Sequence, residues 1–481
     1  MKESSKFYSS LGLLIILNAV VKPVWIFGID RQVQNSVGME AYGAYFSLFN
    51  FSIVFSFLLD WGFTAFFNRQ LAAQKEGFID RVGNFLLIKL IFAVVYAGVV
   101  CMVALFTHVK RWDILLGVIA IQVFTSLFAF LRGIITAQQW FRTDAWLSVL
   151  DKTLMIFLCG SLLYFPSVFG LMTISKFLMV QVSCTSLAMI SVLVILLRRG
   201  VGFSFTSGSL LNPRFIKLAL PFAFTVLLMS VHNRLDGFLL ERIHPNGAYE
   251  AGLYAAAYRL LDAANTVGNL LASFLLAFIA RQWSLQKNIS EIIITTRHQL
   301  MSFSILLSVT VVFMAPWIQQ ILYHHDNAAA VGVLQWCLPA LVGYSMVNIY
   351  GTVMTATGHI ISFSMINLVA VLVNIVLNLL LIPRWGAKGC CIAALASQWI
   401  CGIATLLYVR QKLGIRVHFR SLLMYIFIIA ILCGYFYVGQ QLLMNKWLLI
   451  AGAALVTLTA LVVTKLFRVQ DWINLFKQTD R

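Results

Sequence analysis

The sequence predicts an all-α polytopic membrane protein with about fourteen transmembrane helices. Hydrophobic residues make up 61% of the chain and charged residues only 11%, whereas a soluble protein carries about a quarter charged residues. The apolar residues form blocks of about twenty, the length that a helix needs to cross a hydrocarbon core of about 30 Å. Lipid offers the backbone no hydrogen bonds, and continuous apolar runs without alternation favour helices over a barrel.

The connections between the predicted spans are short. None can fold a soluble domain, so we expect a transporter and not an enzyme. Most of the 35 Lys and Arg residues lie in loops that face the cytoplasm when both termini are cytoplasmic, as the positive-inside rule requires. The net charge of +18 is therefore spread over short loops, and we expect no nucleic-acid partner. The spans are placed near residues 11–29, 43–65, 84–106, 113–135, 146–165, 174–197, 215–240, 250–279, 299–323, 332–356, 360–382, 389–409, 421–441 and 447–467.

An internal repeat divides these spans into two lobes. Residues 38–45 and 247–254 both fit the pattern G-x4-G-x-Y, and residues 65–70 and 277–282 both fit A-F-x-x-R-Q. Two parallel six-helix lobes with a site at their interface are typical of transporters. We therefore predict an N-lobe of spans 1–6 (residues 1–200), a C-lobe of spans 7–12 (residues 201–412), and spans 13–14 with a cytoplasmic tail (residues 413–481).

Lys22 is the most deeply placed basic residue of the first span. A charge near the middle of a bilayer costs about 2.5–3.5 kcal/mol even on lenient scales, so it needs a partner, a hydrated cavity or a ligand. Pro23 follows it and opens backbone groups by interrupting the helix. Snorkelling or pairing with an acid is the alternative, but the depth of Lys22 favours a cavity.

Arg259 and Asp262 share one face near the middle of span eight. They form either a structural ion pair or a site in which Asp262 orients Arg259 toward an anionic substrate, and both interpretations stay open. Arg234 and Asp236 lie in the outer part of span seven, where an interfacial position explains them nearly as well as a cavity. Asp60, near the inner end of span two, is either a gate or a helix-terminus contact.

The remaining charges within spans lie near span ends, where snorkelling is the simpler interpretation. It applies to Lys89, Asp151, Lys152 and Lys176. The cavity candidates are thus more basic than acidic, which favours an anionic cargo, because arginine grips phosphate in a bidentate way and lysine acts as a point charge. The adjacent His324 and His325 lack further ligands, so we expect no metal site.

Four motifs, in order and spacing, resemble those of polysaccharide-biosynthesis flippases. Residues 37–43 look like the family's LGPEEYG loop after span one, with Met39 where proline is usual. Residues 59–63 resemble its l-D-x-G-l motif, and residues 250–260 its e-x-G-x-Y-x-A-A-x-R-l motif. Residues 374–394 resemble N-x-x-L-N-x-x-L-I-P-x-x-G-x-x-G-A-A, with Cys390 and Cys391 where small alanines are expected.

The chain is thus similar to the oligosaccharide-lipid branch of the multidrug/oligosaccharidyl-lipid/polysaccharide exporter superfamily, which is related to the lipid II flippases. The resemblance implies two helical bundles around a basic central cavity, which opens alternately to the two sides of the membrane. Its cargo would be a glycan on undecaprenyl pyrophosphate, as in O-antigen, lipopolysaccharide or exopolysaccharide export, moved across a bacterial cytoplasmic (inner) membrane. Arg259 falls inside a matched motif and Lys22 matches loosely as a basic residue of span one, while Arg31 and Arg234 are inferred as substrate-binding residues without a motif.

The sequence-based hypothesis is therefore a flippase for a lipid-linked glycan. Asp60, Asp236 and Asp262 are its candidate coupling or gating residues. No cofactor is expected, and a proton or sodium ion stays open as a coupling ion. We expect a monomer in the lipid bilayer, working beside other polysaccharide-assembly proteins. The alternatives are a cation-coupled multidrug antiporter of the same superfamily, which would want a buried acid, and a membrane glycan polymerase or ligase, which would want a long periplasmic loop.

Overall fold

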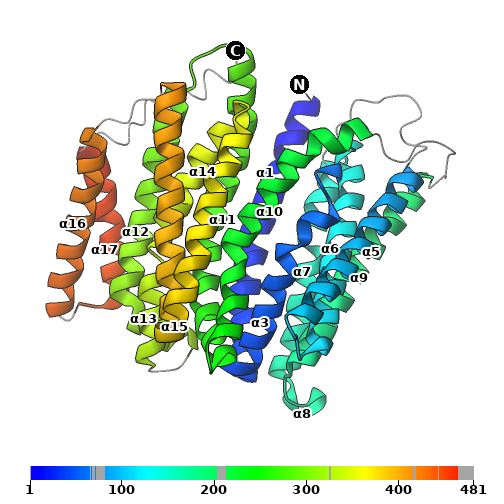
Figure 1. The fold of residues 1–481 in the computed structure, drawn as a ribbon, viewed down its shortest axis with the longest axis horizontal. Coiled ribbons are helices and arrows are strands. Elements are labelled where there is room, and N and C mark those ends of the chain that lie inside the picture. The colour runs from blue at the N-terminus through cyan, green and yellow to red at the C-terminus, as the bar shows by residue number, and fades with distance from the viewer. Residues whose placement is uncertain are drawn as a thin grey trace. The chain divides into compact units, whose positions relative to one another are not determined.

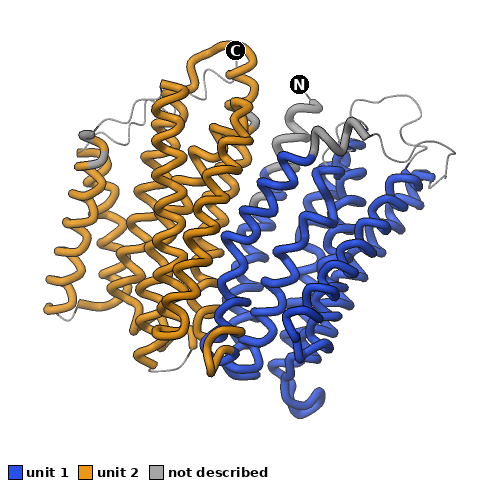
Figure 2. Tube along the Cα trace, in the orientation of Figure 1, with its two compact units in different colours: residues 1–241, 248–252 blue, residues 242–247, 253–481 orange. Residues whose placement is uncertain are grey.

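The computed structural model describes residues 2–64, 67, 71, 82–202, 213–323, 327–414, 419–442 and 444–463. Helices and short connections account for these residues, and no strand occurs among them. Figure 1 shows the helices, and Figure 2 shows two compact units. Unit 1 is residues 1–241 and 248–252, and unit 2 is residues 242–247 and 253–481. The all-α polytopic fold class is confirmed.

Unit 1 is built on helices that pack along their length, with the pairs α6–α9 and α1–α7 in most extensive contact. Its phenylalanine-rich core includes Phe63, Phe67 and Phe130, each no more than 2% exposed. The elements of this unit are α1 (Lys2–Pro23), η1 (Val24–Asp30), α2 (Arg31–Val37), α3 (Met39–Val54), η2 (Ser56–Leu59), α5 (Val82–Phe106), α6 (Trp112–Ala137), α7 (Phe141–Tyr164), α8 (Pro166–Phe169), α9 (Ile174–Arg198) and α10 (Pro213–Ile243, to residue 241).

Unit 2 begins at Arg242, in the last turn of α10. Its most extensive packing is between α14 and α15, where Gly343 and Gly402 allow close approach to Gln398 and Met346. The elements of this unit are α11 (Gly247–Ser284, from residue 253), α12 (Ser290–Tyr323), α13 (Ala328–Cys337), α14 (Ala340–Ala356), α15 (Ile360–Leu413), α16 (Phe419–Gln441) and α17 (Lys446–Val463).

Eleven helices within the described ranges are long and apolar enough to cross a membrane. The prediction of about fourteen spans is close, and the difference has local causes. The helix α15 contains two predicted spans, 360–382 and 389–409, because its backbone leaves helical geometry only at Gly386 (φ 51°, ψ −130°). The predicted span 215–240 lies in α10. The predicted span 43–65 is interrupted, since α3 ends at Val54 and a 3₁₀ turn, η2, follows.

The two copies of the G-x4-G-x-Y pattern contact each other within unit 1. A Cβ added at Gly43 of α3 would collide with the carbonyl oxygen of Ala248, and one added at Gly252 would collide with that of Met39. The side-chain amide of Gln34 donates to the carbonyl of Gly252 at 2.9 Å. Five of the six residues of the first A-F-x-x-R-Q copy, and both His324 and His325, lie outside the described residues. The predicted lobe organisation itself stays a prediction.

Candidate functional site

Lys22 lies in the last turn of α1, directly before a change of helix type. Pro23 has no N–H to donate, so the α-helical hydrogen-bond ladder is interrupted there. Residues Val24–Asp30 are π-helical, and the N–H of Arg31 bonds the carbonyl of Ile26, five residues back. Single π-helical turns inside α-helices occur frequently at functional sites. The helix therefore changes type directly after Pro23, as the sequence predicts. The side chain of Lys22 is exposed on the protein surface.

The charged neighbours of Lys22 come from α6 and α7. Asp151, Lys152 and Arg132 all lie within electrostatic range of its ammonium. The helices α1 and α7 are joined by a hydrogen bond from the Asn18 side-chain amide to the hydroxyl of Ser148 at 2.8 Å. These contacts bring basic side chains from three helices to one region of unit 1.

Two of these basic side chains, Arg132 and Lys152, are paired with aspartates. The Nε of Arg132 bonds Oδ1 of Asp144 at 2.9 Å, and the Asp144 side chain is 7% exposed. The Nζ of Lys152 lies 3.3 Å from Oδ2 of Asp151 and 5.4 Å from the centre of the Trp25 ring. We call Lys22, Arg132, Asp144, Asp151 and Lys152 the cationic cluster, because it carries three basic and two acidic side chains. It suits an anionic group, which both lysine and arginine bind.

The sequence interpretation missed most of this cluster. Arg132 was not among the candidates, and Lys152 was interpreted as a snorkelling residue near a span end. The structure pairs Lys152 with Asp151 and Trp25 on the same part of α7 that faces α1. Arg132 and Asp144 lie on different helices, so their pairing has no signature in sequence spacing. The one signal in the sequence that could have indicated these basic residues is the aspartates near them, since each buried acid needs a basic partner.

Asp30 and Arg31 stand where η1 passes into α2. The Asp30 side chain is 2% exposed, and the phenol of Tyr42 donates to its Oδ2 at 2.9 Å. Arg31 is half-buried. The sequence proposed Arg31 as a substrate-binding residue and gave no role to Asp30, which is the more deeply buried of the two.

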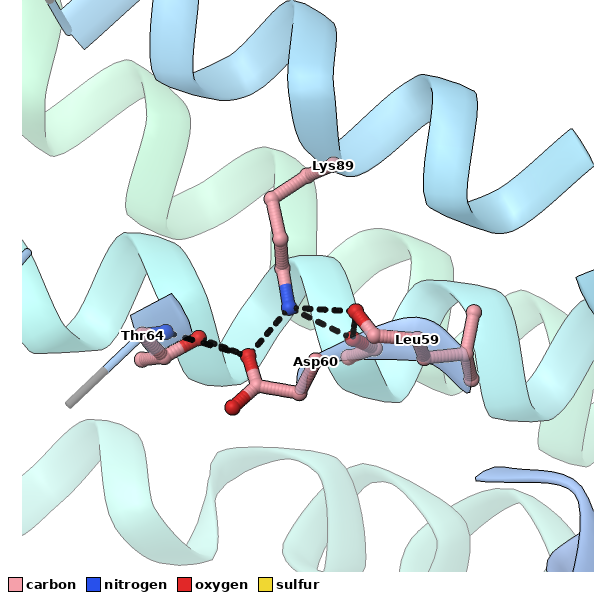
Figure 3. A network of polar contacts seen from close by, with 5 residues as sticks. Leu59, Asp60, Thr64 and Lys89 are labelled. Atoms are coloured by element: carbon pink, nitrogen blue, oxygen red, sulfur yellow. Dashed lines mark hydrogen bonds and ion pairs between the residues drawn. The ribbon is translucent and has the colours of Figure 1, made fainter. Parts of the chain in front are cut away.

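Asp60 is held by a lysine from another helix (Figure 3). The Nζ of Lys89, in α5, bonds Oδ1 of Asp60 at 2.6 Å, the carbonyl of Leu59 at 2.8 Å and the hydroxyl of Ser126 at 3.0 Å. The Lys89 side chain is 1% exposed. The interpretation of Lys89 as a snorkelling residue is therefore wrong, because the buried ammonium is bonded to the carboxylate of Asp60 where span two breaks.

Asp60 also makes the helix-terminus contact that the sequence offered as one of its two roles. Its Oδ1 accepts from the backbone N–H of Thr64 at 3.2 Å and from the Thr64 hydroxyl. Residues 63 and 64 are helical, so the carboxylate satisfies a backbone N–H at the start of a helical turn, where no intrahelical acceptor is available. The gating role stays a prediction.

Arg234 and Asp236 lie in α10, in the part of that helix that packs on α3. The aromatic rings of Phe51 and Phe238 stack with centroids 4.5 Å apart, and Gly237 approaches the ring of Phe46. Asp236 is 2% exposed, whereas Arg234 is half-buried. Asp236 is therefore a buried acid within unit 1.

Arg259 and Asp262 belong to unit 2, and both side chains are half-buried in α11. One turn further on, Asn265 accepts a hydrogen bond at 2.9 Å from the side-chain amide of Asn348 in α14. Asn265, three residues after Asp262, therefore faces protein. The five other site candidates, Lys22, Arg31, Asp60, Arg234 and Asp236, all belong to unit 1.

A second basic residue of unit 2 escaped the sequence interpretation. Arg297 of α12 is 4% exposed, and it interacts with the hydroxyls of Tyr350 and Tyr425. The neighbouring His298 ring Nδ1 lies 2.7 Å from the Tyr425 hydroxyl. These contacts attach α16 to α12 and give the buried guanidinium polar neighbours.

The fold of the chain is similar to those of several solved membrane proteins. The chain aligns with a solved structure of the lipid II flippase MurJ, inward closed conformation, with a TM-score of 0.71 and 16% identity over 96% of this chain and 99% of that one. An inward-facing multidrug resistance MATE transporter gives a TM-score of 0.64 and 13% identity over 83% and 98%. A MOP superfamily transporter from Pyrococcus furiosus, described by a binding pocket of reverse polarity, gives 0.56 and 13% over 84% and 93%.

The comparison with curated proteins gives no sequence match. The family described as "Polysaccharide biosynthesis protein" does match, over residues 8–281. This stretch contains the cationic cluster, the break at Asp60 and both copies of the glycine pattern. Because the match covers more than half of the 481 residues, the chain belongs to the polysaccharide biosynthesis protein family.

Proposed function

We propose that the protein is a flippase that moves a lipid-linked oligosaccharide from the cytoplasmic to the periplasmic leaflet of a bacterial inner membrane by alternating access. The observation that carries the proposal is the cationic cluster of unit 1. It gathers three basic side chains from α1, α6 and α7 in a membrane-spanning bundle. Family membership and the fold of MurJ support the same conclusion.

The cluster suits the pyrophosphate of such a carrier lipid. The guanidinium of Arg132 is aligned by Asp144, so its remaining N–H groups keep a fixed direction. Lys22 and Lys152 act as point charges beside it. The proposal also includes Arg259 as a substrate-binding residue, because it lies in a segment that resembles a flippase motif. The proposal assigns Arg31 and Arg234 a supporting electrostatic role.

The function proposed is transport without bond chemistry. The connections between the predicted spans are short, and the proposal assigns them no catalytic domain. The lipid tail would remain in the bilayer while the glycan occupies hydrated space. A proton or sodium ion is the proposed source of coupling.

A cation-coupled exporter of small molecules is the second candidate. Two buried carboxylates favour it, since Asp30 and Asp236 are each 2% exposed, and a cation exporter needs such an acid. MATE transporters also have this fold. In that case, Asp30 or Asp236 would exchange a coupling ion for the exported compound.

Deletion of the gene followed by lipid extraction tests the flippase proposal. We expect one carrier-linked oligosaccharide to accumulate on the cytoplasmic side, and the wild-type gene to clear it. Unchanged lipid-linked glycans together with increased sensitivity to cationic drugs would instead establish the exporter. A strain expressing the protein with Lys110→Ala, an exposed loop lysine, serves as the matched control for expression and insertion.

A further inference from the structure

The break in span two leaves a backbone carbonyl without its helical donor. In a continuous helix the N–H of Phe63 would bond the carbonyl of Leu59, but it bonds that of Asp60 instead, at 2.7 Å. Trp61 and Gly62 have φ of 47° and 75°, a region that L side chains rarely adopt. The carbonyl of Leu59 thus projects sideways, toward α5 and α6.

Three oxygens of different kinds converge beside this break. They are the carbonyl of Leu59, the carboxylate of Asp60 on the same segment, and the hydroxyl of Ser126 in α6. The hydroxyl of Ser126 also lies 3.4 Å from the Leu59 carbonyl. In membrane transporters, unwound backbone carbonyls and nearby acids are the groups that bind coupling cations.

The Lys89 ammonium occupies the centre of these oxygens (Figure 3). Its three N–H donors match the three acceptors at 2.6, 2.8 and 3.0 Å, and the ring of Phe130 lies 6.0 Å away. Lys89 belongs to α5, a different element from those that supply the oxygens, so its positive charge is covalently attached to the protein. The Asp60 side chain, in contrast, is 37% exposed and leaves a route from the surface to the oxygens.

We propose that the helix break at Leu59–Asp60 is a monovalent-cation site and that the ammonium of Lys89 is its resident cation. The site therefore needs no free sodium or potassium ion in the wild-type chain, and a chain without the Lys89 amine binds one instead. The inference concerns the local structure of unit 1 and does not depend on which cargo the protein carries.

The test measures thermal stability of purified protein in detergent. Lys89→Ala and Lys89→Ser both remove the amine and empty the site. We expect both variants to melt at least about 3 °C higher in sodium, potassium or methylammonium chloride than in choline chloride at equal ionic strength. Methylammonium reproduces the missing amine, whereas choline has no N–H and is too large.

Three controls separate this site from others. The wild-type protein measures any cation effect elsewhere in the chain, and that effect is subtracted. Asp60→Asn/Lys89→Ser removes the charged oxygen, and the cation-specific shift should disappear. Asp60→Asn/Lys89→Met replaces the charged pair by neutral side chains and shows that the segment still folds.

The proposal is overturned if the Lys89 variants fold but show no shift beyond that of wild type. It is also overturned if neither variant folds in any of the three cations while Asp60→Asn/Lys89→Met does, because a filled site should restore the fold. Either result would make Lys89–Asp60 an ion pair with a purely structural role. Since no cargo is involved, failure here leaves the flippase proposal intact.

Discussion

Gly43 of α3 and Gly252 of α11 pack backbone against backbone, and a Cβ added at Gly43 would lie 2.5 Å from the amide nitrogen of Gly252. The two glycines occupy the same position of the repeated G-x4-G-x-Y pattern. Both have helical neighbours and neither has a positive φ. The requirement for glycine here is therefore close approach and not backbone freedom.

Gly43→Ala should destabilise the protein by about 1–3 kcal/mol or more, because a buried helix pair must separate to admit the methyl group. Thermal stability and the yield of monodisperse protein in detergent measure the effect. Gly98→Ala is the matched control, since Gly98 lies inside α5 with open space around it, and alanine there should be neutral or stabilising by up to about 1 kcal/mol. Equal behaviour of the two variants would contradict the close packing.

Lys22→Ala should reduce export of the glycan strongly, and Arg259→Ala should do so as well, at wild-type levels of protein in the membrane. Each removes a charge proposed to hold pyrophosphate, and a hydrogen bond to a charged group contributes about 1.5–3 kcal/mol, or roughly tenfold or more in binding. Surface glycan and the lipid-linked intermediate are the measurements.

Lys22→Arg keeps the charge and should retain more activity than Lys22→Ala. Lys110→Ala changes an exposed loop lysine and should leave export unchanged. If Lys22→Ala keeps surface glycan at the wild-type level, Lys22 does not bind the cargo, and the same result for Arg259→Ala would exclude Arg259.

Tyr425→Phe should lower the melting temperature of the protein, because it removes the hydroxyl that contacts His298 at 2.7 Å and that interacts with Arg297. Leaving buried polar groups without a partner costs about 1–3 kcal/mol. Tyr437→Phe, in the same helix but 63% exposed, should change stability by no more than about 0.5 kcal/mol. An equal loss in both variants would mean that the contact between α12 and α16 does not depend on this hydroxyl.

Hydropathy alone predicted the fold class, because the length and apolar character of a span are local properties. The effect of Pro23 was also predictable, since a missing N–H interrupts a helix whatever surrounds it. The break at Asp60 was not, although Gly62 follows within two residues. Its cause is tertiary, because Lys89 and Ser126 from two other helices compensate the carbonyl that the break exposes.

The candidate site was predicted only in part, because some of its residues are identified by local sequence properties and others only by tertiary contacts. Lys22 was identified by depth, which sequence reveals, whereas Arg132 and Lys152 join it through helix packing, which sequence spacing does not reveal. Lys89 shows the limit most clearly. It lies about 10 Å along α5 from the start of that helix, a depth from which a lysine can reach water, but its contacts with Leu59, Asp60 and Ser126 hold it in a buried position.

Asp60→Asn should destabilise the protein by about 3–5 kcal/mol, because it leaves the Lys89 ammonium buried without its carboxylate. Asp60→Asn/Lys89→Met should recover most of that loss, since both charges are then gone and the methionine stem fills the same volume. A melting-temperature cycle over wild type, both single variants and the double variant measures the coupling. Asp113→Asn provides the contrast, because its ion pair with Arg111, at a similar 2.8 Å, is 50% and 53% exposed and should contribute no more than about 1 kcal/mol. Similar losses for Asp60→Asn and Asp113→Asn would show that burial does not strengthen the dependence of Lys89 on its partner.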